Sequence, residues 1–389
     1  MTGGIPAATG GRTGVWFLGA RGSVATTAAV GALAIAQDLV APTGLVTSLP
    51  GLAGAGLPAL GDLVLGGHDV IATPLAKRAE LLADGGVVPR ALVRAVTPGL
   101  DEIDGRLRQV VVHTGGPQRG CAERIEADIR RFREDERLDR VVVVDLLPTR
   151  PQPAPHPGLD DLDALEAALD GPDEVLPAGS LYVYAALRAG CPVAEFTPGP
   201  GPRLPALQQL AEREGLPWAG SDGKTGETLL KAALAPMFAA RALRVTSWAG
   251  TNILGGGDGA ALADPGALAS KARSKGLVLP EILGYDPEAP VHIENVADMG
   301  DWKTAWDHIA FEGFLGTRMT MQFTWQGCDS SLAAPLVLDL ARLLAAAHAA
   351  GRSGPQPALG FFFKDPVGTR EHRLTQQLED LLEWAGGLG

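Results

Sequence analysis

The sequence predicts an α/β fold built from two parts. In the first half, short β-branched runs alternate with helical patterns, which is typical of a parallel sheet with crossover helices. From about residue 229 the runs alternate apolar and polar residues, which favours a second, mixed sheet, and helical patterns return after about residue 332. We therefore expect a first domain from residues 1–228 plus 332–389 and an inserted α+β domain from residues 229–331.

Length and composition limit the class of protein. A chain of 389 residues, 46% of them hydrophobic and 20% charged, is long enough to form two cores. The net charge of −12 and the pI near 5.1 argue against a nucleic-acid partner and against an acidic membrane surface. The three cysteines lack metal-ligand spacing, and residues 1–13 lack the apolar segment of a secretory signal. We expect a cytoplasmic protein that has no membrane partner.

The elements of the first part follow from their patterns. Continuous apolar runs are typical of buried strands, and the alanine-rich run after the first of them is typical of a tightly packed helix. The expected strands are 14–19, 44–48, 109–115 and 140–147, the expected helices are 23–36 and 121–139, and the expected proline-rich loops are 150–158 and 196–205.

The elements of the second part alternate apolar and polar residues before helical periodicity resumes. Such alternation is typical of strands with one buried face, and it occurs here in three runs. The expected strands are 244–254, 289–298 and 317–327, and the expected helices are 331–352 and 370–387.

The turn after the first strand has the form G-x-R-G-x-x-A, from Gly19 to Ala25. Glycines between a strand and a helix let a pyrophosphate approach the backbone, so the turn indicates dinucleotide binding in a Rossmann-like domain. The acidic residue expected about 20 residues later is missing, because 44–48 offers only Thr47 and Ser48. The alternative is a turn that only packs the helix on the strand.

Lysine is scarce in this chain. Only seven of the 33 basic residues are lysine, and six of these fall between residues 224 and 364. Arginine keeps its proton in a protein, whereas a partly buried lysine can lose it, so lysine is needed where protons move. Lys271 and Lys275 lie one helical turn apart, and the alternative is a solvated helix face.

Polar segments accompany these lysines. Asp222, Lys224 and Thr225 precede a helical pattern, Asn252 and Asp258 flank a glycine loop, and Lys364 follows an aromatic run. Each has a structural alternative: a helix cap, an Asp-Gly turn, or a lysine that extends to solvent from a strand end. Taken singly, each segment is better explained by structure than by catalysis.

Taken together and in order, seven segments resemble the myo-inositol-1-phosphate synthase (inositol-3-phosphate synthase) family, particularly its shorter microbial branch. The resemblance runs from about Gly14 to Gly368. The segments are "GARGSVATT", "GSDGKTGETL", "NILGGGDG", "SKARSK", "GDWK", "DSSLAAPLVLDL" and "FFFKDPVG".

The resemblance implies a Rossmann-like NAD-binding domain, a sugar-phosphate substrate, a homotetramer and a set of site residues. The implied catalytic residues are Lys271, Lys275, Lys303, Lys364, Asp222, Asp258 and Asp329. The implied cofactor contacts are Gly19, Ala20, Arg21, Gly22, Ser23, Val24, Asp69, Asp222, Asn252 and Asp258. The implied substrate contacts are Ser221, Lys224, Thr225, Asn252, Leu254 and Lys275. Gly256 and Gly257 replace two asparagines of the longer branch, so the need for a monovalent or divalent cation stays open.

The family converts D-glucose 6-phosphate to 1D-myo-inositol 3-phosphate by oxidation at C5, enolisation, aldol closure and reduction. By resemblance we expect Lys271 and Lys364 to act at the C5 oxygen, and Lys303 with Asp329 beside it to act at the C1 oxygen. Because proton transfer excludes arginine, Lys271→Arg should be inactive while Arg273→Lys is tolerated.

Three alternatives stay open at the level of sequence. A family member that makes another cyclitol phosphate, for example from fructose 6-phosphate, would keep the same residue types. A simple NAD-dependent sugar-phosphate dehydrogenase would also join a Rossmann-like domain to a mixed sheet. A non-catalytic NAD-binding protein would have no need for lysines at proton-transfer positions.

Overall fold

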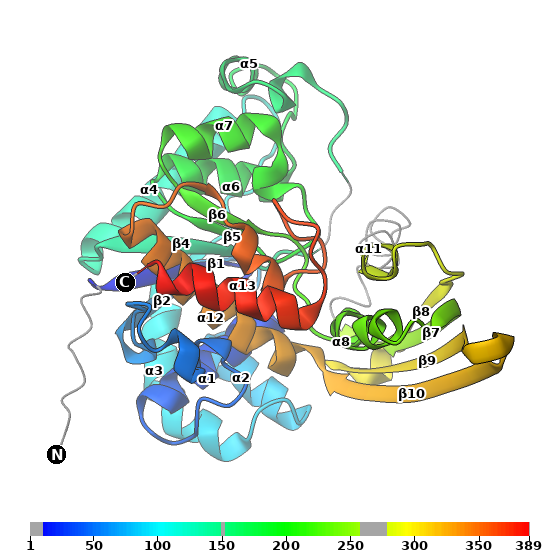
Figure 1. The fold of residues 1–389 in the computed structure, drawn as a ribbon. Coiled ribbons are helices and arrows are strands. Elements are labelled where there is room, and N and C mark those ends of the chain that lie inside the picture. The colour runs from blue at the N-terminus through cyan, green and yellow to red at the C-terminus, as the bar shows by residue number, and fades with distance from the viewer. Residues whose placement is uncertain (1–10, 149–151, 257–277, 389) are drawn as a thin grey trace.

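The computed structural model describes residues 11–148, 152–256 and 278–388, and it contains two sheets (Figure 1). The first sheet has seven strands in the order β11-β6-β5-β4-β1-β2-β3, and all its pairs are parallel. This order is that of a Rossmann-type sheet with one added edge strand, so the predicted fold class is confirmed. The strands are β1 (Thr13–Leu18), β2 (Leu63–Asp69), β3 (Leu107–Gln109), β4 (Arg140–Asp145), β5 (Val193–Glu195), β6 (Pro217–Gly220) and β11 (Gly354–Pro355).

Helices cover both faces of this sheet, so its central strands are buried on both sides. One face is covered by α1 (Ser23–Ala36), α2 (Leu75–Asp84), α3 (Arg90–Arg106), α12 (Asp329–Ala349) and α13 (Leu374–Gly386). The other face is covered by α4 (Arg119–Asp135), α5 (Leu162–Ala168), α6 (Ala178–Arg188) and α7 (Pro205–Arg213).

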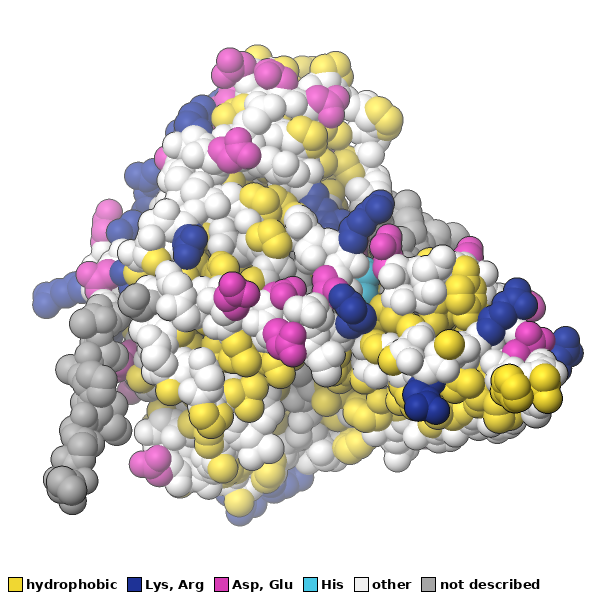
Figure 2. All heavy atoms as spheres, viewed as in Figure 1, with side chains coloured by type: hydrophobic (Ala, Val, Ile, Leu, Met, Phe, Trp, Pro, Cys, Tyr) yellow, Lys and Arg dark blue, Asp and Glu magenta, His cyan; other side chains and the backbone are white. Residues whose placement is uncertain are grey.

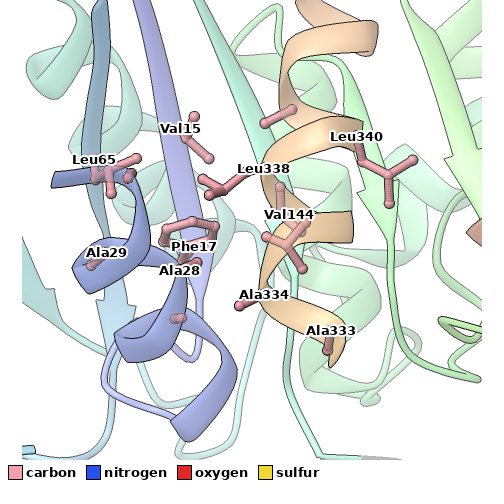
Figure 3. Packing of buried hydrophobic residues seen from close by; sticks show 14 of the residues in the cluster. Val15, Phe17, Ala28, Ala29, Leu65, Val144, Ala333, Ala334, Leu338 and Leu340 are labelled. Carbon is pink, nitrogen blue, oxygen red and sulfur yellow. The ribbon is translucent and has the colours of Figure 1, made fainter. Parts of the chain in front are cut away.

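Small side chains bring two of these helices close to the strands. Val15 and Phe17 of β1 point to the same side as Val144 of β4, where Ala28 of α1 and Ala334 of α12 meet them (Figure 3). Alanines on the facing sides of α1 and α12 allow these helices to pack closely against each other and against the same face of the sheet. The helix predicted at 23–36 is therefore confirmed, and its start is held at the end of β1.

Among the helices that the structure describes, α12 alone has the length and composition of a membrane span. Most of its side chains are buried against α1 and the parallel sheet. Burial of this kind is that of a core helix, which meets the same criteria of length and composition.

The second sheet has four strands in the order β10-β9-β7-β8. β9 pairs antiparallel with β7 and β10, and β8 pairs parallel with β7, so the sheet is mixed as predicted. Phe238, Trp248 and Ile309 form the core beneath one face. The elements are α8 (Glu227–Ala240), β7 (Arg244–Leu254), α11 (Val278–Leu283), β8 (Val291–Asn295), β9 (Trp302–Glu312) and β10 (Arg318–Cys328).

The strand predicted at 44–48 is wrong. Residues Val46–Ser48 form a 3₁₀ helix, and the backbone N–H groups of Val46 and Thr47 donate to the carboxylate of Asp339 in α12, at 2.7 and 3.0 Å. Those N–H groups are not available to a sheet, and the second strand begins only at Leu63.

Other boundaries also differ from the prediction. Of the strand expected at 109–115 only the first residue pairs in β3, because Val111 donates its N–H to the hydroxyl of Tyr182. The aromatic run before Lys364 is a 3₁₀ helix and not a strand. The short 3₁₀ helices are Val46–Ser48, Pro50–Leu52, Leu60–Asp62, Pro157–Leu159, Gly201–Arg203, Ala297–Met299, Phe314–Gly316 and Pro357–Phe362.

Candidate active site

A cavity of about 430 Å³ lies between the carboxyl edge of the parallel sheet and the four-stranded sheet. Gly19, Asp69 and Phe196 line it from the ends of β1, β2 and β5, and Leu254 and Lys303 line it from the second sheet. In open α/β sheets, ligands bind at the carboxyl ends of strands where the strand order reverses. Here that point is between β1 and β4, so the cavity lies where such a fold binds its ligand.

The predicted dinucleotide turn forms the floor of this cavity. Gly19 has a φ of +86°, which favours glycine, and a Cβ atom on Gly22 would lie 3.1 Å from the carbonyl oxygen of Gly19. Gly22 is the N-cap of α1 and has no side chain to cap the helix, and the first helical residues, Ser23 and Val24, line the cavity. Uncapped N–H groups at a helix N-terminus suit a pyrophosphate, and the turn therefore fits NAD.

An acidic residue, Asp69, stands at the place in the fold where the sequence pattern offered none. It is the last residue of β2, next to β1, where a dinucleotide fold places its ribose-binding acid. The carboxylate accepts hydrogen bonds from the N–H groups of Arg21 and Ile71, at 2.6 and 2.7 Å. The usual spacing of about 20 residues between the glycine turn and this acid does not hold here, because three 3₁₀ helices lie between α1 and β2.

The side chain of Arg21 has a structural role. Its guanidinium donates to the carboxylate of Asp104 and to the carbonyl oxygen of Ile71. Those bonds turn the group away from the cavity, which it does not line. Arg78 of α2 does line the cavity, and its Nε donates to the carbonyl oxygen of Arg21 at 2.9 Å.

The first lysine of the cavity is Lys303, near the start of β9. Its ammonium forms an ion pair with Asp329, the first residue of α12, and lies 3.5 Å from the hydroxyl of Thr225. Thr225 also donates to Asp329 at 2.8 Å. A Cβ atom on Gly226 would lie 2.7 Å from the Lys303 Nζ, so the lysine fits there because residue 226 is glycine.

The second lysine of the cavity is Lys364. Its Nζ donates to the carboxylate of Asp222 at 2.7 Å, and the two side chains are 10% and 7% exposed. The backbone N–H of Lys364 also donates to the carbonyl oxygen of Asp222. Two lysine–aspartate pairs from distant parts of the chain therefore line one cavity.

Sequence reasoning gave Asp301 no role. Its carboxylate accepts from the hydroxyls of Ser23 and Ser330, at 3.3 and 2.8 Å, so it joins the dinucleotide turn to the start of α12. The next residue, Trp302, lines the cavity and donates its indole N–H to the carbonyl oxygen of Gly85. Their position directly before Lys303 was the available signal.

Not every predicted residue lines the cavity. Lys224 is buried and its ammonium donates to Gln377, while Asn252 is buried and its amide donates to Glu227 at 2.8 Å. Ser221 and Ala20 are also buried and lie outside the lining. Thr225, Leu254 and the backbone of the glycine turn do line it. Three predicted residues, Asp258, Lys271 and Lys275, lie outside the described residues.

Comparison with known proteins agrees with this arrangement. The family model described as myo-inositol-1-phosphate synthase matches residues 13–385. The chain belongs to the myo-inositol-1-phosphate synthase family. Inositol-3-phosphate synthase 1 of Bacteroides thetaiotaomicron is 33% identical over 93% of this chain and 91% of its own length.

Solved structures show the same fold for this family member. Inositol-3-phosphate synthase of Caenorhabditis elegans has a TM-score of 0.85 at 22% identity, over 98% of this chain and 86% of its own. A myo-inositol-1-phosphate synthase-related protein of Thermotoga maritima has a TM-score of 0.75 at 24% identity, over 96% of this chain and 98% of its own. Membership of the family assigns NAD as the cofactor and an isomerase as the enzyme class.

Proposed function

We propose that this protein is an NAD-dependent isomerising cyclase that converts D-glucose 6-phosphate to 1D-myo-inositol 3-phosphate. The observation that supports this most is the pair of lysine–aspartate contacts, Lys303–Asp329 and Lys364–Asp222, in one cavity beside a dinucleotide turn. The Bacteroides relative, which carries the name inositol-3-phosphate synthase 1, is covered along nearly its whole length.

The proposed reaction leaves the redox state of the sugar unchanged overall. NAD, when bound, takes and later returns the hydride at C5. Lys364, held by Asp222, exchanges a proton with the C5 oxygen as that carbon becomes a ketone and then an alcohol again. The ketone acidifies the C6 protons, and a base removes one of them. The enolate that results attacks the C1 aldehyde through C6, so the proton lost at C6 balances the proton gained at the C1 oxygen. Lys303, held by Asp329, supplies the proton and positive charge that the C1 oxygen needs as the ring closes.

Both lysines sit in a setting suited to this work. Each ammonium is mostly removed from water and faces a carboxylate, which keeps it oriented and stores the proton between steps. Thr225, bonded to Asp329, is the proposed contact to a sugar hydroxyl or the phosphate. Lys271 acting with Lys364, and Lys275 at the phosphate, complete the proposal on the strength of the resemblance.

A cation is part of the proposal. Asp301 and Asp329 bring two carboxylates to the cavity beside the dinucleotide turn. No three His, Cys, Asp or Glu side chains cluster to hold a metal within residues 11–148, 152–256 and 278–388. A cation there would therefore be bound jointly with phosphate oxygens, and its requirement is tested by omitting each salt in turn.

We also propose a homotetramer assembled through the four-stranded sheet. Trp306 on β9 is 43% exposed, and Phe314 and Leu315 at the β9–β10 turn are 88% and 87% exposed. Figure 2 shows hydrophobic side chains gathered at this outer end of the sheet. Light scattering on the eluted protein measures the assembly, and a monomer in solution would contradict it.

Product identification tests the proposed function. The protein is incubated with NAD⁺ and either glucose 6-phosphate or fructose 6-phosphate, and the cyclitol phosphate is identified by NMR. We expect inositol 3-phosphate from glucose 6-phosphate without accumulation of NADH. A cyclitol formed only from fructose 6-phosphate, stable NADH with an oxidised sugar, or binding without turnover would each overturn the proposal and favour, respectively, another cyclase, a dehydrogenase or a non-catalytic protein.

A further inference from the structure

Lys224, which does not line the cavity, occupies a dry site of its own. Lys224 is 3% exposed, and its Nζ lies 5.7 Å above the ring centre of Phe361. The side-chain nitrogen of Lys224 donates a hydrogen bond to the side-chain oxygen of Gln377, which belongs to α13 near the end of the chain. The contact joins residues 153 positions apart.

Gln377 is held so that its oxygen must face Lys224. Its amide nitrogen donates to the carbonyl oxygens of Glu371 and Gly360, at 2.6 and 3.2 Å. Both donors are therefore used, and only the oxygen remains for the lysine. Within the described part of the chain, no carboxylate forms an ion pair with Lys224, so an uncharged amide is its polar partner there.

Burial lowers the pKa of Lys224 to about 7. The titratable group facing it is His372, whose pKa is lowered by burial and then by Lys224. Glu281, Asp365 and Glu371 act on that histidine in the opposite direction and more weakly. Lys224 thus changes charge near neutral pH, in a site where the charged form is poorly solvated.

The backbone around Lys224 carries the partners of both cavity lysines. The N–H of Asp222 donates to the carbonyl oxygen of Thr197, and that of Gly223 to the carbonyl oxygen of Phe196, both at 3.0 Å. The N–H of Lys224 donates to the carbonyl oxygen of Phe362 at 2.8 Å. Two residues before Lys224, Asp222 binds Lys364. One residue after it, Thr225 binds Asp329, the partner of Lys303.

We infer that Lys224 is a positioning residue: its bond to Gln377 anchors segment 221–225 to α13, so that Asp222 and Thr225 hold the cavity lysines in register with one another. The inference rests on the proposed function. It also gives the C-terminal helix, which does not line the cavity, a role in the reaction. The neutral amine already donates this hydrogen bond, and protonation adds a charge that no carboxylate in the described residues neutralises, which favours opening of the segment to water.

Two variants test the anchor from its two ends. Lys224→Met removes the amine and keeps the length of the side chain, and Gln377→Met removes the acceptor. We expect roughly tenfold lower kcat in each, no further loss in the double variant, and less than a twofold change in the Kd for NAD⁺. Lys77→Met, at a 58% exposed lysine paired with Glu80, is the control and should match the parent protein.

The pH profile separates positioning from general support of the fold. In the parent protein, kcat should fall below pH about 7, and Lys224→Met should flatten that acidic limb, because the titrating amine is gone. Thermal midpoints are measured beside it. An unchanged kcat and pH profile in a folded Lys224→Met, or fully additive losses in the double variant, would overturn the inference. If Lys224→Met does not fold, Gln377→Met decides.

Hydrogen exchange keeps the inference separate from the proposed function. Amides of segment 221–225, corrected for intrinsic rates, should exchange progressively faster as pH falls from 10.5 to about 7 in the parent protein, because only the exposed amine is protonated in that range, and show no such change in Lys224→Met. Failure of the parent protein to turn over glucose 6-phosphate would reject the function alone. Exchange that is independent of pH in the parent protein would reject the anchor, whatever the substrate.

Discussion

The two sheets of this molecule bury their strands to different extents. All six residues of β1 are buried, and apolar side chains fill both faces of the parallel sheet. In the four-stranded sheet α8 and α11 cover one face only, and β10 alternates exposed and half-buried residues along most of its length. We call the parallel sheet with its helices the thick unit, and the four-stranded sheet with α8 and α11 the thin unit. The thick unit supplies the dinucleotide turn and the thin unit supplies Lys303. Cofactor binding should therefore depend on the first unit, and the chemistry on both.

Of the changes that distinguish the two units, removal of Lys303 should have the largest effect, and it should act on kcat. Lys303→Met takes the proton and the positive charge from the C1 oxygen, so we expect kcat to fall roughly 10³- to 10⁴-fold. The Kd for NAD⁺ should stay within about twofold, because the turn at Gly19 lies in the other unit. Steady-state kinetics and calorimetry measure the two quantities.

Lys303→Arg is the matched control for charge. It keeps the ion pair with Asp329 but holds its proton too tightly to transfer it, so it should be nearly as inactive as Lys303→Met. Activity within tenfold of the parent protein would mean that Lys303 contributes charge and no proton.

The core of the thin unit should be sensitive to a single cavity. Phe238 is fully buried, and its ring packs edge-on against Trp248 at 6.2 Å and at a tilt against Phe311 at 5.0 Å between ring centres. Phe238→Ala should cost about 3 to 4 kcal/mol in the free energy of unfolding. Chemical denaturation followed by tryptophan fluorescence measures it.

The neighbouring residue provides the control. Met237 lies on the same helix and is 40% exposed, so Met237→Ala should change the free energy of unfolding by less than about 0.5 kcal/mol. If Phe238→Ala also abolishes NAD⁺ binding while the protein remains folded, the two units are coupled more tightly than their separate cores indicate.

A change in the dinucleotide turn should weaken NAD⁺ binding, which the changes in the thin unit should leave intact. Gly19→Val places a branched side chain at a φ of +86°, with its Cβ 3.2 Å from the carbonyl oxygen of Leu146. The free turn relaxes to relieve a strain of about 2 kcal/mol, and binding NAD⁺ must restore the strained conformation, so the Kd for NAD⁺ should rise roughly 30-fold. Gly31→Ala, in the same helix region but with open space around its Cβ, should leave the Kd unchanged. Equal affinities would show that the turn does not bind the cofactor.

The sequence predicts most reliably where one pattern fills a whole element. The helix at 23–36 and the strand at 244–254 were predicted with the bounds that the structure shows, because their residues are continuously small and apolar or alternate regularly. β9 was missed because its alternation is disguised by a buried carboxylate. Asp307 is fully buried in that strand, and its carboxylate accepts a hydrogen bond from the indole of Trp248 at 2.8 Å.

At the site, the scarcity of lysine in the chain indicated which lysines to consider, but it did not predict where their side chains point. The resemblance placed Asp329 beside Lys303, and the structure brings the two together. Lys224 and Lys364 are both scarce lysines in segments that resemble the family, yet the Lys224 amine faces α13 and the Lys364 amine faces the cavity. That difference depends on Gln377, far along the chain, and no local pattern contains such a contact.

The smallest effect we predict concerns the segment that was mistaken for a strand. The Asp339 carboxylate, which binds Val46 and Thr47, is fully buried, and burial raises its pKa from 3.8 to about 6. The folded protein therefore holds this proton more tightly than the unfolded chain, and its contribution to stability is present at low pH and is lost as pH rises. Between pH 4 and pH 6 it should lower the free energy of unfolding by about 2 kcal/mol relative to Asp339→Asn, which does not titrate. Denaturant titrations of both proteins across this range measure the difference. Parallel curves would mean that hydrogen bonds from the 3₁₀ helix keep Asp339 ionised throughout this pH range.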